Sequence, residues 1–103
     1  MMIKIPIGNK EFRVFQFVRE DGWGQLNAEE TIQSATVTAS DATTGEAITG
    51  MVSDVAPYNS TAVRYFIDPG GAEVVKRSRI TLLFTVVTSN GQTLTDTLQM
   101  VII

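Results

Sequence analysis

The stretch ITLLFTVVTSNGQTLTDTLQMVI, residues 80–102, decides the fold of this 103-residue chain. Two runs rich in β-branched and apolar residues flank Ser89-Asn90-Gly91, which is typical of a β-hairpin. A two-residue loop would mix apolar and polar residues on one face, with Phe84 opposite Thr97. A three-residue loop over 89–91 shifts the register by one residue, and every side chain then changes face. We predict this second register, with a glycine bulge, because it aligns three apolar pairs: Ile80 with Met100, Leu82 with Leu98 and Val86 with Leu94.

In that register the apolar C-terminus, Val101–Ile103, belongs to the last core strand, and Asp96 lies on the apolar face opposite Phe84. The outer face of the hairpin has few charged residues for a solvated surface. It is a candidate surface for binding a partner protein, with Leu83, Val87, Thr95 and Thr97 as its candidate residues. The alternative is a merely solvated face, since threonine is a good strand residue.

The rest of the chain also reads as all-β. Short runs of β-branched and aromatic residues are bounded by glycine, proline, asparagine and aspartate, and helical periodicity is nearly absent. Ile32 is out of phase with the strand that follows, which predicts a bulge near Gln33–Ser34. Residues 40–60 are ambiguous, with an irregular corner at 56–59. The expected strands outside the hairpin are 11–18, 31–39, a weak one at 51–55, and 63–67.

At the N-terminus, Ile3, Ile5 and Ile7 alternate with Lys4 and Pro6. Proline cannot donate to an inner ladder, so residues 1–10 are expected to be an N-terminal arm or an edge strand of a single domain spanning 1–103. Such a strand is a candidate for addition to a neighbouring protein. Deleting residues 1–8 is then expected to leave a folded chain with weaker assembly.

The amino-acid composition limits the kinds of catalytic and metal-binding site that the chain can form. The chain has no cysteine and no histidine, which removes the commonest nucleophile–base pairs and metal ligands. The acidic pairs Glu20-Asp21 and Glu29-Glu30 lack the alternating spacing of a calcium loop. We therefore expect no enzyme activity, no catalytic residue, no cofactor and no metal.

The net charge and the hydropathy of the chain indicate which classes of partner to expect. The net charge of −3 argues against nucleic acid, and the basic run Lys76-Arg77-Ser78-Arg79 reads as a polar lead-in to a buried strand. No stretch approaches the ~20 apolar residues of a membrane-spanning helix. We expect neither a nucleic-acid nor a membrane partner.

Three segments carry a resemblance to a known family: ETIQSATVTA (30–39), VRYFIDPGGAEV (63–74) and the hairpin at 80–102. In this order they resemble small virion proteins of phages and prophages of the fibre–tail adaptor type. The resemblance implies an immunoglobulin-like antiparallel β-sandwich of about seven short strands. It also implies a virion structural protein, made in the bacterial host cytoplasm and present in multiple copies, that joins phage tail and fibre proteins.

Two segments depart from the family's pattern. The family opens with a tyrosine–tryptophan strand, whereas this chain has EFRVFQFVREDGWGQL and an extra arm at 1–10, and residues 40–60 match poorly. No individual contact residue is therefore transferred. A second hypothesis is a sugar- or surface-binding module, which requires an exposed aromatic side chain, with Trp23, Tyr58 or Tyr65 as candidates.

Overall fold

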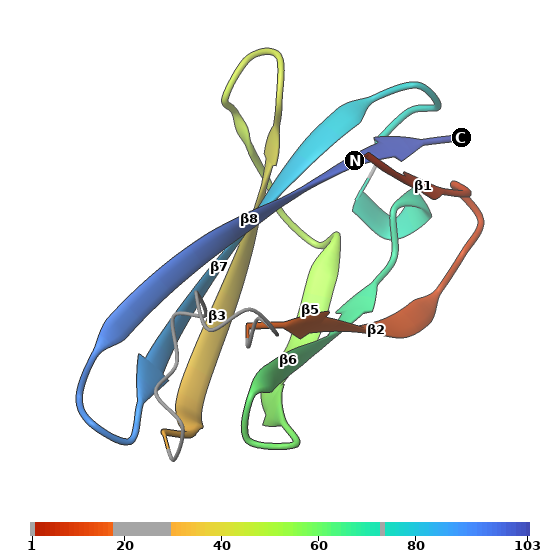
Figure 1. The fold of residues 1–103 in the computed structure, drawn as a ribbon. Coiled ribbons are helices and arrows are strands. Elements are labelled where there is room, and N and C mark those ends of the chain that lie inside the picture. The colour runs from red at the N-terminus through yellow and green to blue at the C-terminus, as the bar shows by residue number, and fades with distance from the viewer. Residues whose placement is uncertain (1, 18–29, 73) are drawn as a thin grey trace.

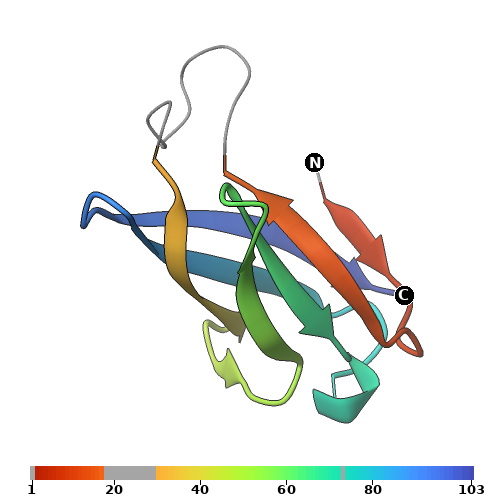
Figure 2. The same ribbon diagram turned by 90° about the horizontal axis from the view of Figure 1, so that it is seen from below.

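The structure, a computed structural model, describes residues 2–17, 30–72 and 74–103, which form eight β-strands in two layers (Figures 1 and 2). The larger sheet has the order β1 (Ile3–Ile5), β8 (Thr93–Ile102), β7 (Arg79–Thr88), β3 (Ile32–Asp41), β4 (Ala47–Ile48). The smaller sheet has the order β2 (Glu11–Gln16), β6 (Ala62–Ile67), β5 (Val52–Tyr58). A single turn of 3-10 helix, η1 (Gly70–Ala72), follows β6. The all-β sandwich is confirmed, and β4 is a strand that the sequence did not predict.

The C-terminal hairpin has the predicted register. Strand β7 pairs with β8 so that Ile80 faces Met100, Leu82 faces Leu98 and Val86 faces Leu94. Thr88 N donates to Gln92 O at 2.9 Å, which closes a loop over residues 89–91, and Gly91 has a φ of 79°. A glycine at this position supplies the left-handed conformation of the bulge without a Cβ penalty. Asp96 lies opposite Phe84, is half-buried, and accepts a hydrogen bond from Thr97 N at 2.8 Å.

The bulge predicted in the third strand is also confirmed, because the β3–β7 register shifts between Ile32 and Ser34. The irregular corner expected at 56–59 was wrong. Strand β5 continues through Pro57 to Tyr58, and the turn follows at Asn59 and Ser60, both with positive φ. Proline is tolerated there because β5 lies at one edge of the smaller sheet.

The core lies between the two layers, and aromatic rings occupy its middle. Phe84 of β7 is fully buried, and the Phe15 ring of β2 stacks on it with centroids 4.2 Å apart. The Tyr65 ring of β6 meets Phe84 edge-on at 5.3 Å. Residues that alternate along each long strand fill the space around these rings, so both sheets are joined by one apolar cluster.

The predicted N-terminal arm belongs to the body of the domain. Strand β1 pairs in parallel with β8, and Ile5, opposite Ile102, is fully buried in the core. Beyond the strand, Ile7 N donates to Ile103 O at 2.8 Å, and Ile103 N donates to Ile5 O at 2.9 Å. The expectation that the chain folds without residues 1–8 does not fit this structure, because removing β1 would uncover apolar side chains of β8.

One end of the sandwich is closed by polar contacts around the β7–β8 turn. Glu30 and Thr88 are both buried, and the Thr88 hydroxyl donates to a Glu30 carboxylate oxygen. Thr31 N donates to Ser89 Oγ at 3.0 Å, and Ser89 N donates to Thr31 O at 2.8 Å. Glu30, from the acidic pair Glu29-Glu30, is therefore a structural residue. Glu29 and the pair Glu20-Asp21 lie outside the described residues.

Candidate partner-binding surface

The outer face of the larger sheet presents an uncharged grid of side chains. The registers of β3, β7 and β8 set four rows side by side, which we call the threonine face: Ser34–Val87–Thr93, Thr36–Thr85–Thr95, Thr38–Leu83–Thr97 and Ser40–Thr81–Gln99. Most members are exposed and the rest are half-buried. Within these four rows no side chain carries a charge. A solvated sheet face ordinarily bears lysine and glutamate, so this composition favours contact with another protein.

The structure brings four of the predicted partner-binding residues together on this face. Leu83 and Val87 are each 39% exposed, and Thr95 and Thr97 are exposed beside them on β8. Leu83 and Val87 are four positions apart on the same side of β7, with Thr85 between them on that side. The apolar side chains thus lie within a polar, hydrogen-bonding surround, an arrangement that protein interfaces use.

The isoleucines of the N-terminal strand are not part of that face. Ile3 and Ile5 point inward from β1, where Ile5 has no exposed surface, and Ile7 is half-buried next to the C-terminus. A side chain without exposed surface cannot contact a partner while its strand stays in place. The prediction of a partner-binding role for Ile5 is therefore corrected, because these residues complete the chain's own core.

A second apolar surface, which the sequence analysis missed, lies on the outer face of the smaller sheet. We call it the aromatic patch: Phe12, Val14, Arg64 and Phe66. Phe12 and Val14 are 51% and 50% exposed, more than Leu83 and Val87. The Phe12 ring meets Phe66 edge-on at 5.0 Å, and the Arg64 guanidinium carbon lies 4.8 Å from the Phe12 ring centroid. The signal in the sequence was a change of phase, since apolar residues of EFRVFQF occupy even positions first and odd positions afterwards.

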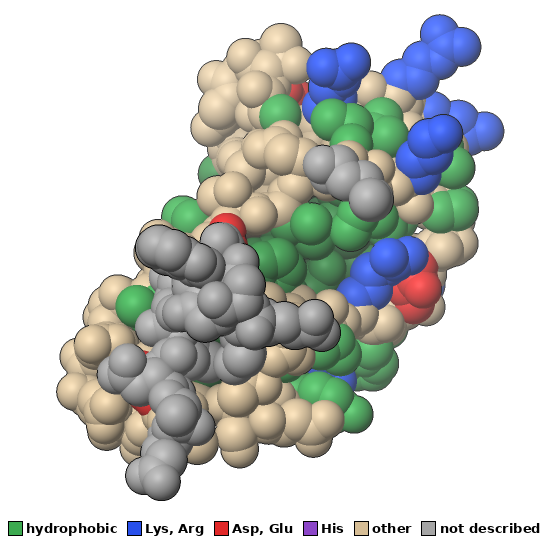
Figure 3. All heavy atoms as spheres, in the orientation of Figure 1, with side chains coloured by type: hydrophobic (Ala, Val, Ile, Leu, Met, Phe, Trp, Pro, Cys, Tyr) green, Lys and Arg blue, Asp and Glu red, His purple; other side chains and the backbone are tan. Residues whose placement is uncertain are grey.

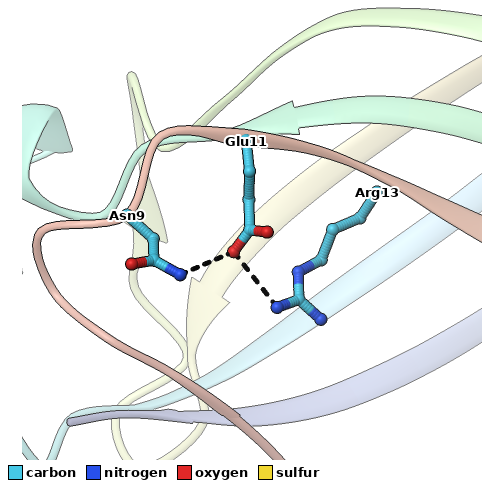
Figure 4. A network of polar contacts seen from close by, with 3 residues as sticks. All are labelled: Asn9, Glu11 and Arg13. Carbon is cyan, nitrogen blue, oxygen red and sulfur yellow. Dashed lines mark hydrogen bonds and ion pairs between the residues drawn. The ribbon is translucent and has the colours of Figure 1, made fainter.

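The inner positions at the start of β2 carry charges in place of apolar side chains. Glu11 Oε1 accepts hydrogen bonds from Asn9 Nδ2 at 2.8 Å and from Arg13 at 3.1 Å (Figure 4). The Asn9 amide, followed by the Arg13 guanidinium, lowers the pKa of Glu11 below its ordinary value of 4.5. Arg13 Nε is buried and, among the described residues, has no hydrogen-bond partner.

The aromatic residues proposed for a sugar-binding module differ in their exposure to solvent. Tyr58, at the end of β5, is 41% exposed. Tyr65 is buried against Phe84, and this burial raises the pKa of its phenol above the ordinary value of 10.0. Tyr65 is therefore a core residue and not part of a binding platform. Trp23 lies outside the described residues.

The predicted basic run leads into β7. Lys76, Arg77 and Arg79 are exposed, and the strand registers add Lys4 to the same end of the larger sheet, one strand away from Arg79 across Val101. Figure 3 shows Lys and Arg side chains gathered at the end of the molecule where the two termini lie. The backbone of the run is tied down, because Arg77 N donates to Ile102 O at 2.5 Å.

Two cavities flank the short strand β4. The larger, of about 330 Å³, lies between β4, Ala72 and residues 74–80. The smaller, of about 280 Å³, lies between β4, β3 and the start of β5. Asp41 and Glu46 are the acidic groups of the larger one. Among the described residues there is no cluster of three or more potential metal-binding side chains, and no helix long and apolar enough to cross a membrane.

Comparison of the chain with protein-family models, with curated proteins and with solved structures finds no match. The resemblance to phage adaptor proteins therefore stays a prediction.

Proposed function

We propose that this chain is a non-enzymatic structural protein of a phage or prophage virion. In this role it acts as an adaptor in the tail or neck and joins tail and fibre proteins through protein–protein contacts. The observation that carries the proposal is the threonine face, where Leu83 and Val87 are exposed in a grid without charge. An uncharged, partly apolar sheet face of this kind is suited to desolvation against a partner, whereas a free solvated face is not.

The arrangement of strands supports the family resemblance behind this proposal. If β2, β6 and β5 are taken as the B, E and D strands of an immunoglobulin-like sandwich, then β3, β7 and β8 take the places of C, F and G. The order β8-β7-β3 facing β2-β6-β5 agrees with that assignment. The proposal places the chain in the assembled particle in multiple copies, after synthesis in the bacterial host cytoplasm, without nucleic acid or membrane as a partner.

The rival proposal, a sugar- or surface-binding module, rests on a narrower observation. Tyr58 is exposed at 41%, as a ring that stacks on a sugar must be. It stands at the end of an edge strand, next to the Asn59–Ser60 turn. Binding to a glycan array that is lost in a Tyr58→Ala variant would favour this rival.

The test of the adaptor proposal is peptide mass spectrometry on phage particles purified by density gradient from cells that carry the gene. The chain is expected in a fixed ratio to the tail proteins, and that ratio gives its copy number. Particles that contain the tail proteins without this chain would refute the proposal.

The same particles test the surface. A Leu83→Lys variant, which places a charge in the threonine face, is expected to be incorporated poorly. Val75→Lys is the matched control, because Val75 is 67% exposed and precedes β7, outside the grid. Equal incorporation of both variants would remove the threonine face from the argument, even if the chain itself is present in the particle.

A further inference from the structure

In the part of the chain that the structure describes, four strands lie at the edges of the two sheets. Three of these edge strands are protected against pairing with another chain. Strand β1 has three residues and is followed by Pro6, while β4 has only two residues. Strand β5 has a bulge around Asp54, whose φ is 50°, and contains Pro57. Short strands, prolines and bulges are the devices by which proteins guard sheet edges. Strand β4 pairs with only two residues of β3, and β3 also lies beside β5 of the other sheet.

Strand β2 has none of these devices. It spans six residues, Glu11–Gln16, without proline, glycine or bulge, and pairs with β6 in unbroken register. Its other side has no strand in the sheet order of the described residues. An unguarded edge with exposed apolar side chains is a template for pairing with another strand.

The free edge carries the backbone groups of the even-numbered residues. Phe17 N donates to Thr61 O at 3.1 Å, just past the end of β2. Because hydrogen-bonded pairs alternate along an antiparallel ladder, the odd residues of β2 bond to β6. The N–H and C=O groups of Phe12, Val14 and Gln16 therefore point away from the sheet, toward the free edge.

The side chains of β2 show which strand fits this edge. On the inner face, Glu11 and Arg13 are neighbours two positions apart, with opposite charges. Consider the β2 strand of a second copy that pairs with this edge in antiparallel orientation, with the two Phe12 residues opposite each other. Glu11 of each copy then lies opposite Arg13 of the other copy. Opposite charges in directly opposed positions stabilise a strand pair.

We propose that two copies of this chain associate through antiparallel pairing of their β2 strands, related by a two-fold axis at Phe12. The two three-stranded sheets would then form one continuous sheet across the dimer. Phe12 exchanges two hydrogen bonds with Phe12 of the second copy, and each Lys10–Val14 pair on either side exchanges two more. This association does not depend on the virion role.

Other registers of the same pairing are less favourable. Directly opposed residues of an antiparallel pair lie on the same face of the sheet. The inner faces of the two copies therefore join only if the two-fold axis passes through a residue, and not between two residues. A centre at Arg13 opposes two guanidinium groups, and a centre at Val14 opposes Arg13 with Phe15. The centre at Phe12 brings together the two Phe12 rings, each already packed against its own Phe66. It also gives the partly exposed Arg13 guanidinium, whose Nε is buried without a hydrogen-bond partner among the described residues, a second carboxylate.

The first test is the mass of the chain in solution by sedimentation equilibrium over a wide range of concentrations. The wild type is expected to reach the mass of two chains, and Val14→Pro is expected to remain a single chain, because proline removes an N–H that points to the free edge. Val14→Thr is the matched control, since it keeps that N–H and the shape of the side chain, and it is expected to dimerise. A wild type that stays a single chain at all concentrations refutes the proposal, as does a dimer that Val14→Pro leaves unchanged.

The second test fixes the register. Glu11→Arg and Arg13→Glu each create two like-charged contacts per dimer and are expected to weaken association by about tenfold or more. The double variant, with both changes, restores opposite charges across the axis and is expected to recover most of the affinity. If Val14→Pro blocks the dimer but the three charge variants all dimerise like the wild type, the register centred on Phe12 is overturned.

Discussion

The same substitution at two phenylalanines tests the two-layer core against its surface. Phe84 is fully buried, where it stacks on Phe15 at 4.2 Å and meets Tyr65 edge-on at 5.3 Å. Phe12 is 51% exposed and contacts Phe66 and Arg64 on the outside of the smaller sheet. Replacing each with alanine removes the same atoms from opposite environments.

The expected losses follow from these environments. Phe84→Ala leaves a cavity that both sheets line, and such changes cost about 3–5 kcal/mol of unfolding free energy. That is a large part of the roughly 5–15 kcal/mol that holds a domain folded. Phe12→Ala loses one edge-on aromatic contact and one exposed cation–π contact, for about 1 kcal/mol in total.

Both losses are measured by urea unfolding followed by circular dichroism. The protein is kept dilute, since association through β2 would otherwise add to the apparent stability. A loss at Phe84 that is no larger than the loss at Phe12 would refute the packing described here, because an interior ring would then be contributing no more than a surface one.

Further outcomes are expected for changes in the N-terminal strand, at Glu11 and at two glycines. Ile5→Ala should lower the unfolding free energy by about 2–5 kcal/mol, because Ile5 is fully buried; deletion of residues 1–8 should abolish the cooperative transition, and a truncated chain of wild-type stability would show that β1 is dispensable. Glu11→Gln should cost roughly a few tenths of a kcal/mol at neutral pH, since the ion pair is partly exposed. Because the folded-state pKa of Glu11 is lowered, the wild-type advantage is present above 4.5 and should vanish as pH falls through the folded value; a difference that persists in strong acid would contradict the contribution of the carboxylate. Gly91→Ala should lower the unfolding free energy by about 1 kcal/mol, because φ is 79° at this position. Gly8→Ala should lower it far less, because a Cβ at Gly8 meets open space and the φ of Gly8 is not positive. Equal losses at the two glycines would contradict the explanation from backbone conformation.

Much of the larger sheet was predictable because its constraints are local in the chain. The loop at 89–91 sets the hairpin register, and alternation then decides the face of each residue, including the exposed Leu83 and Val87. The bulge near Ser34 followed from the phase of one isoleucine. Strand β4 was missed because two residues leave no periodicity to detect, and β5 was cut short because Pro57 reads as a break although an edge strand tolerates it.

The amino-acid sequence by itself determined the all-β class, the hairpin register and the absence of histidine and cysteine chemistry, since these depend on composition and on pairing between neighbours in the chain. Only the tertiary structure decided which surfaces are free. Ile5 and Phe12 are both apolar residues of strands at a sheet edge, yet Ile5 is covered by the core between the two sheets and Phe12 faces outward. Their difference arises from how the layers stack, and stacking is a property of segments distant in sequence that periodicity alone does not specify.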